Sequence, residues 1–143
     1  MATSLVRILV VDDFGPWRQK VCSILQTRPE WRVVAEAEDG LEAVQKAGEL
    51  KPDLIMLDIG LPSLNGLETA NRIRFFAPDA VIIFLTANCD KDMEQAALKT
   101  GARGYVLKTN AGSELLTAIA GILAGDDFVS SGIAGNSSEA EDA

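Results

Sequence analysis

Short runs of apolar residues alternate along the chain with stretches in which apolar residues recur every three or four positions. The short apolar runs predict strands at 7–11, 54–57, 80–85 and 104–107. A further segment, 31–37, alternates between apolar and polar residues, which is typical of a strand at a sheet edge. Continuously apolar strands are buried on both faces, so the other four runs predict the interior of a parallel sheet.

In the segments between these strands, apolar residues recur at the spacing of an α-helix. Asp39 is placed to cap the second helix, with Glu42 three residues later in the capping-box position, and Pro52 is expected to end it. The residues expected to face the core are Trp17, Val21, Ile24 and Leu25; then Leu41, Val44 and Ala47; Leu67, Ala70 and Ile73; Met93, Ala96 and Ala97; and finally Leu115, Leu116, Ile119, Ile122 and Leu123.

Five strands that alternate with five helices predict an α/β fold, with a parallel sheet covered by helices on both faces. From Gly125 onward the character of the sequence changes. Residues 130–143 are rich in Ser, Gly, Ala and acidic side chains, a composition typical of flexible segments. We therefore predict one domain over residues 6–125 and a flexible linker or tail over residues 126–143.

Composition narrows the range of functions. The formal net charge is -8, which argues against nucleic-acid binding because phosphate backbones attract basic surfaces. No histidine is present, which excludes Ser-His-Asp and Cys-His catalysis, His-ligated zinc and a phosphohistidine carried by this chain. Two cysteines, Cys22 and Cys89, do not form a disulfide framework, and no apolar run reaches the length of a membrane span. A cytoplasmic location is the simplest interpretation.

Polar residues stand where the predicted strands stop. Asp12 and Asp13 end the first strand, Asp58 the third, Thr86 the fourth and Lys108 the fifth. The carboxyl ends of parallel strands share one edge of the sheet, which is where open α/β sheets bind ligands. Each residue alone has an ordinary explanation, such as a turn, a helix cap or a solvated charge. Their repeated position at strand ends is the informative feature.

Three clustered carboxylates repel one another, and a hard divalent cation such as Mg²⁺ relieves that repulsion. Bound Mg²⁺ commonly serves a phosphoryl group, which a nearby lysine and hydroxyl can also stabilise. A carboxylate is a recognised covalent nucleophile. The set of side chains is therefore suited to phosphoryl transfer onto an aspartate.

Four stretches together resemble the receiver domain of two-component response regulators: ILVVDD at 8–13, PDLIMLDIGLPSLNG at 52–66, VIIFLTA at 81–87 and GARGYVLK at 101–108. The resemblance covers residues 6–125. The segment 104–127 is also similar to the LuxR/NarL-type subgroup, whose output domain is a helix-turn-helix. The family implies a flavodoxin-like (CheY-like) sheet of five strands in the order 2-1-3-4-5, flanked by five helices.

The resemblance assigns roles residue by residue. Asp58 resembles the phosphoacceptor that takes a phosphoryl group from the phosphohistidine of a sensor histidine kinase. Asp13 and Asp58 resemble direct Mg²⁺ ligands, joined by the Gly60 backbone carbonyl, while Asp12 acts mainly through water. Three further groups resemble contacts of the phosphoryl group: the Lys108 ammonium, the Thr86 hydroxyl and the Ala87 backbone N–H.

The family also implies a switch, in which Thr86 moves toward the phosphoryl group and Tyr105 turns inward. The residue-based alternative for Tyr105 is a half-buried tyrosine on an edge strand. The switch changes the face formed by the fourth helix, fifth strand and fifth helix. This implies a bacterial, cytoplasmic, non-enzymatic signalling domain, with a sensor kinase and an output domain as partners and a possible homodimer.

Two features depart from the family or vary within it. Thr109 replaces the usual proline after Lys108, and a cis bond before a non-proline residue costs roughly 3 kcal/mol, so the isomer of the Lys108–Thr109 bond is left open. Gly60 and Asn88 occupy two positions that tend to set the rate of dephosphorylation in the family. These two residues do not indicate whether that rate is high or low in this protein.

Other functions fit less well. A small Mg²⁺-dependent phosphotransferase resembling haloacid dehalogenases needs Asp-x-Asp after the first strand, whereas Asp12 and Asp13 are adjacent. A flavin-binding module needs a phosphate loop after the first strand, and none is present. A receiver-like binding module that is never phosphorylated remains the main alternative.

Overall fold

A six-stranded parallel sheet forms the centre of the protein. The computed structural model describes residues 5–61, 64–87 and 90–130. The strands lie in the order β2-β1-β3-β4-β5-β6, and every neighbouring pair is parallel. The predicted order 2-1-3-4-5 is confirmed, and one strand is added at the β5 edge. The strands are β1 (Val6–Val11), β2 (Trp31–Ala37), β3 (Leu54–Asp58), β4 (Val81–Thr86), β5 (Gly104–Leu107) and β6 (Phe128–Val129).

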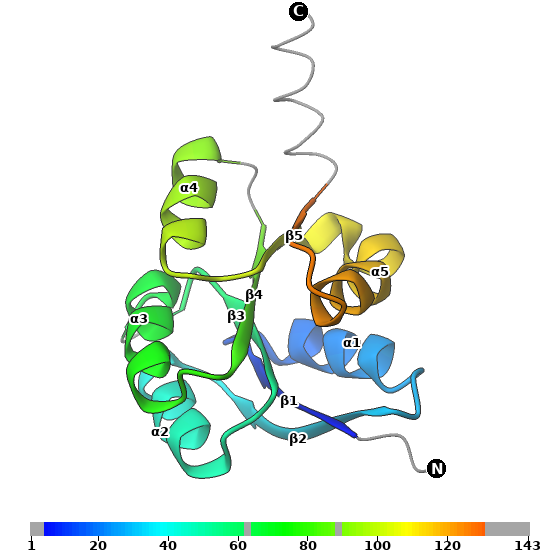
Figure 1. Cartoon of the computed structure of the whole chain (residues 1–143), viewed down its shortest axis with the longest axis horizontal. Helices are drawn as coiled ribbons and strands as arrows, with labels where there is room; N and C mark the ends of the chain where they lie inside the picture. The colour runs from blue at the N-terminus through cyan, green and yellow to red at the C-terminus, as the bar shows by residue number, and fades with distance from the viewer. Residues whose placement is uncertain (1–4, 62–63, 88–89, 131–143) are drawn as a thin grey trace, which may run out of the picture.

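Five helices cover the two faces of the sheet. On one side lie α1 (Gly15–Leu25) and α5 (Ala111–Leu123); on the other lie α2 (Gly40–Leu50), α3 (Gly66–Phe76) and α4 (Lys91–Lys99) (Figure 1). Side chains alternate between the faces along each strand. Leu9 packs in the cluster that includes α2 and α3, whereas Val10 packs in the cluster that includes α1 and α5. The two-faced α/β architecture is therefore confirmed.

The ends of α2 follow the predicted chemistry. The Asp39 carboxylate accepts a hydrogen bond of 2.8 Å from the Glu42 backbone N–H, as an N-cap does. The Glu42 carboxylate accepts at 2.8 Å from the N–H of Glu38, one residue before the position that a capping box uses. The helix ends at Leu50, two residues before Pro52.

The core-facing residues of α2 differ from the prediction. Leu41 was expected to face inward, but its side chain is 55% exposed. The buried positions are Gly40, Ala43 and Ala47. A Cβ on Gly40 would lie 2.3 Å from the Leu64 carbonyl oxygen, so the helix start approaches this neighbour too closely for a larger residue. Close helix packing therefore buries the small residues and leaves the larger Leu41 outside. In α5, Leu123 is likewise exposed.

The sixth strand is short and lies within the segment predicted to be a linker. Phe128 and Val129 pair with Gly104 and Tyr105 of β5. Tyr105 is completely buried, and not half-buried as expected for an edge strand. β6 flanks β5 on its outer side, and Val129 of β6 packs against the core cluster that contains Tyr105. The domain boundary near residue 125 stays a prediction, since residues 131–143 lie outside the described part of the chain.

Cys22 is a buried thiol of α1, whereas Cys89 lies outside the described residues. Burial raises the pKa of the Cys22 thiol from 9.0 to about 11, helped by the negative charge of Glu36. The thiolate fraction at pH 8 is then about one hundredth of the usual value. In a Cys89→Ser variant we expect Cys22 to resist iodoacetamide at pH 8 until the protein is unfolded, as followed by intact mass. Rapid alkylation of the folded variant would contradict the buried placement.

Candidate functional site

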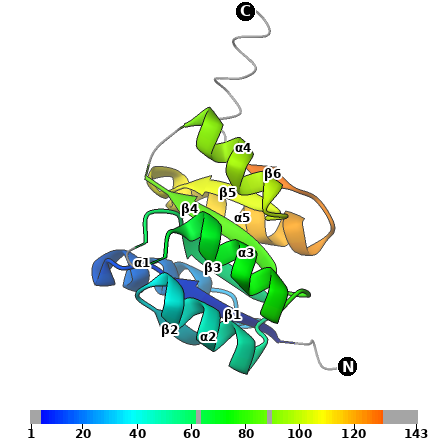
Figure 2. The ribbon, with the colours of Figure 1, turned by 90° about the vertical axis from the view of Figure 1, so that its left-hand side faces the viewer.

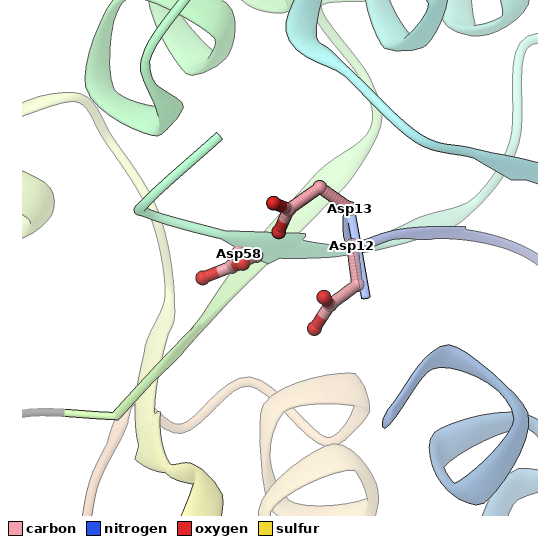
Figure 3. Close-up of side chains that lie close together, drawn as sticks. All are labelled: Asp12, Asp13 and Asp58. Carbon is pink, nitrogen blue, oxygen red and sulfur yellow. The ribbon is translucent and has the colours of Figure 1, made fainter. Parts of the chain in front are cut away.

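Three carboxylates from two neighbouring strands meet at the carboxyl edge of the sheet. Asp12 and Asp13 follow β1, and Asp58 is the last residue of β3. One carboxylate oxygen from each lies within 4.8 Å of the others, and Figure 3 shows the side chains beside one another at the strand ends. Asp12 and Asp58 are buried, whereas Asp13 is exposed. The predicted acidic cluster therefore exists, with an oxygen donor set suited to a hard divalent cation.

Lys108 supplies the positive charge of this cluster. It is the first residue of the 3₁₀ turn η1 (Lys108–Asn110), directly after β5. Its Nζ lies 2.7 Å from Asp12 Oδ2 and 3.4 Å from Asp58 Oδ2. The lysine side chain is only 10% exposed. Lys108 is therefore a buried counter-ion shared by two carboxylates, and not a solvated surface charge.

Asp12 is held in place by its local backbone. Its Oδ1 accepts a hydrogen bond of 2.9 Å from the Phe14 N–H, which closes the turn between β1 and α1. Its backbone carbonyl accepts at 2.8 Å from the Arg18 guanidinium, which also forms an ion pair with Glu36. These contacts orient Asp12 toward Lys108.

Asp58 carries the clearest electrostatic perturbation of the site. Burial raises the pKa of its carboxyl group, and the nearby charge of Asp12 raises it further, while Lys108 and the Gly60 N–H oppose the change. Gly60 donates its N–H to Asp58 Oδ1 at 3.2 Å. A buried carboxylate with a raised pKa is common in functional sites.

A pocket of about 360 Å³ opens above Asp58. Its lining residues are Asp58, Ile59, Gly60, Thr86, Ala87, Asp90, Met93 and Lys108. The structure thus brings the predicted acceptor, hydroxyl, backbone donor and lysine to one space. No atom lies within 4 Å of where a Cβ on Gly60 would stand, so the pocket is open on that side.

Tyr105 belongs to β5 and is fully buried, so its side chain already points inward. It does not line the pocket above Asp58.

Asn88, at the second position that tends to set dephosphorylation rate, lies outside the described residues. The described residues contain no cis peptide bond, so the Lys108–Thr109 bond is trans.

Two residues that support this site were not assigned to it from the sequence. Trp17 was expected only as a core residue of the first helix, yet Lys108 Nζ lies 5.6 Å from the centroid of its ring, within cation–π range. Arg18 was not singled out, although it binds the Asp12 carbonyl. Both follow Asp13 within a few residues, a place where side chains of α1 can reach the strand ends.

The sequence and the fold match known proteins. The sequence profile of the response regulator receiver domain family matches residues 8–120. Transcriptional regulatory protein LiaR of Bacillus subtilis is 34% identical over 131 residues, which are 92% of this chain and 62% of that protein. The nitrate/nitrite response regulator protein NarL of Escherichia coli is 36% identical over 124 residues, covering 86% of this chain and 57% of NarL.

Solved structures give the same result. A two-component response regulator of the LuxR family from Aurantimonas matches with a TM-score of 0.90 at 35% identity, over 98% of this chain and 100% of that chain. The response regulator domain of CheB from Thermotoga maritima matches with a TM-score of 0.76 at 35% identity, over 81% and 94% of the two chains.

The chain spans little more than half the length of the curated relatives it matches, namely 62% for LiaR and 57% for NarL. The similarity therefore concerns one domain of those longer proteins. The profile match extends over most of the described residues and includes all five strand-end side chains of the acidic edge. This chain accordingly belongs to the response regulator receiver domain family, with relatives among the LuxR/NarL-type regulators of bacteria.

Proposed function

We propose that this domain is the phosphorylatable switch of a two-component phosphorelay, with Asp58 as the phosphoacceptor. The observation that carries the proposal is that Asp58 lines an open pocket together with Thr86 and Lys108. Lys108 Nζ lies 3.4 Å from Asp58 Oδ2, and the carboxylates of Asp12 and Asp13 lie beside that of Asp58.

In the proposed reaction an oxygen of the Asp58 carboxylate attacks the phosphorus atom of a phosphohistidine on a sensor kinase. A P–O bond forms, the P–N bond breaks, and its electron pair returns to the histidine ring nitrogen. Lys108 stabilises negative charge on the transferred oxygens, because its buried ammonium already points at the acceptor. The Thr86 hydroxyl and the Ala87 N–H are proposed to donate to the same oxygens, and both residues line the pocket.

Mg²⁺ is the proposed cofactor. The donors fit it: carboxylate oxygens of Asp12, Asp13 and Asp58 lie within 4.8 Å of one another, and hard cations prefer such ligands. Asp13 and Asp58 would bind the ion directly together with the Gly60 carbonyl, and Asp12 would act mainly through water. The bound ion would neutralise charge that develops on the phosphoryl oxygens.

The proposed output is a change in the face formed by α4, β5 and α5. A phosphoryl group adds about -1.5 to -2 charges at Asp58, and Thr86 is expected to move toward it. Tyr105 is buried in the structure, so the proposed switch concerns how strongly its inward position is favoured. The proposed partners are a sensor histidine kinase, a helix-turn-helix output domain and, on this face, a second copy of the receiver.

Among the described residues, no helix is both long enough and apolar enough to cross a membrane. We propose a cytoplasmic location for the domain, as the functional assignment requires access to a kinase. The alternative function is a receiver-like binding module that acts without phosphorylation. The two functions differ in whether Asp58 gains a phosphoryl group.

We expect the protein to gain one acid-labile phosphoryl group when it is incubated with Mg²⁺ and acetyl phosphate, as followed by intact mass. An Asp58→Asn variant is expected to gain none, since an amide is a poor nucleophile, and a chelator should prevent the gain in the wild type. Asp79→Asn, a matched change of an exposed aspartate outside this pocket, should behave as wild type. Beryllofluoride binding is the second test, because some receivers do not react with small donors. Failure of both would favour the phosphorylation-independent module.

Mg²⁺ alone is expected to stabilise the folded protein, because it binds the clustered carboxylates only when they are brought together. At an ion concentration of 100 times the dissociation constant, the free energy of unfolding should rise by about 2.7 kcal/mol. Thermal unfolding with and without Mg²⁺ measures this rise. Asp13→Asn should remove most of the rise, while Asp79→Asn should keep it. An equal rise in both variants would show nonspecific ion binding and contradict the site.

A further inference from the structure

The chain returns to the sheet after α5 and lies along β5. Residues 125–130, which we call the strap, contain the two-residue strand β6. The Phe128 N–H donates to the Arg103 carbonyl at 3.0 Å, and the Ser130 N–H donates to the Tyr105 carbonyl at 2.8 Å. Figure 2 shows β6 beside β5 at the edge of the sheet. The strap is therefore bonded to the strand that carries Tyr105.

Arg103 anchors the beginning of the strap. Its Nη2 donates to the Gly125 carbonyl at 2.7 Å and to the Asp126 carbonyl at 3.3 Å. Its Nε forms an ion pair with Asp127. One side chain thus holds three successive residues that follow α5, and it stands immediately before β5.

Ser130 anchors the end of the strap and connects it to the phosphoacceptor site. The serine is completely buried. Its Oγ accepts a hydrogen bond of 3.1 Å from Asn110 Nδ2 and donates to the Glu114 carboxylate of α5. Asn110 belongs to η1, the single 3₁₀ turn that begins with Lys108. A fixed Ser130 therefore restrains the same turn that carries the lysine of the site.

These contacts make the strap a bridge between the acidic site and the chain that follows the domain. Tyr105 pairs with β4 on one side and with the strap on the other. The turn η1 carries Lys108 at its start and Asn110, which donates to Ser130, at its end. We infer that docking of the strap and occupation of Asp58 by a phosphoryl group favour each other. This inference rests on the proposed function of Asp58 and assigns a regulatory role to a segment outside the acidic pocket.

The sign of the coupling follows from the geometry. A phosphoryl group on Asp58 attracts the Lys108 ammonium, which restrains η1. A restrained η1 presents Asn110 to Ser130, so the strap docks more tightly. Linkage requires the reverse effect of equal size: a docked strap favours the loaded site. A strap that only covers the sheet edge would dock equally in both states.

Hydrogen exchange of the whole chain tests the coupling, with Mg²⁺ and beryllofluoride as the phosphoryl mimic. Loading is measured separately by the ¹⁹F signal of bound fluoride. On loading, we expect exchange of the Phe128 and Ser130 amides to slow by about five-fold or more. Bound fluoride with unchanged exchange at both amides would overturn the coupling alone. Absence of bound fluoride would overturn the coupling, and together with failed acetyl phosphate labelling it would overturn the proposed function as well.

Two variants weaken the strap without touching the acidic site. Ser130→Ala removes the contacts with Asn110 and Glu114, and Arg103→Gln loosens the other end. Each is expected to weaken apparent beryllofluoride affinity by about five-fold, because a smaller fraction of molecules has a docked strap. Ser113→Ala is the matched control. Ser113 is exposed, and its Oγ donates to the backbone carbonyl of Asn110 and not to the side chain that contacts Ser130. Wild-type affinity in a folded Ser130→Ala or Arg103→Gln protein would overturn the inference.

Discussion

Replacing Lys108 by methionine is expected to lower the free energy of unfolding by about 3 to 5 kcal/mol at neutral pH without Mg²⁺. Lys108 is the ammonium paired with both Asp12 and Asp58, and all three side chains are at most 10% exposed. Methionine has a similar length but no charge, so two buried carboxylates would lose their shared counter-ion. Urea denaturation of the two proteins measures the difference.

The pH dependence separates loss of charge from loss of packing. Lys108 lowers the pKa of Asp58, so its removal should raise that pKa further above the ordinary value of 3.8. A carboxyl group with a raised folded pKa binds more protons in the folded than in the unfolded state, so stability falls as pH rises above 3.8 through the folded value. The deficit of the variant should therefore shrink in acid.

Two comparisons complete the Lys108 experiment. Lys91→Met changes an exposed lysine at the start of α4, and it should alter stability by no more than about 0.5 kcal/mol. Added Mg²⁺ should recover part of the deficit of Lys108→Met, because a cation compensates the same carboxylates. A deficit that is equal in acid and at neutral pH would mean that packing, and not charge, accounts for the effect.

Replacing Gly66 by alanine is expected to destabilise the protein by about 3 kcal/mol and to weaken Mg²⁺ binding. Gly66 begins α3 directly against the end of β3. A Cβ there would lie 2.5 Å from Ile59 Cα and 2.6 Å from the Asp58 carbonyl oxygen. Both neighbours are backbone atoms that cannot rotate away, so α3 or the residue carrying the acceptor carboxylate must move. Thermal unfolding and Mg²⁺ titration measure the two effects.

Gly121→Ala is the matched control for Gly66→Ala, and it should act in the opposite direction. Gly121 lies inside α5, and no atom lies within 4 Å of where its Cβ would stand. Alanine in a helix interior is favoured over glycine by up to about 1 kcal/mol, so this variant should be slightly more stable. Equal effects of the two substitutions would show that the contact of Gly66 with the Asp58 backbone is unimportant.

The positions of the acidic site could be predicted because they depend on a simple rule. In a parallel sheet, strand ends share an edge, so Asp12, Asp58 and Lys108 meet once their strands are recognised. The supporting residues could not be predicted in this way. Trp17 reaches Lys108 from a helix, and Gly66 approaches Asp58 from another, and helix periodicity does not specify which strand end a side chain contacts.

The sequence by itself determined the alternation of strands and helices, the parallel sheet and the residues at its carboxyl edge, because periodicity and apolar runs are local properties. The tertiary structure alone decided three other features. It buried Ala43 and left Leu41 outside, since close helix contacts favour small residues. It added β6, whose two residues are too few to give a pattern. It also buried Tyr105 in a core cluster against which Val129 of β6 packs, because burial depends on which distant segments of the chain come together.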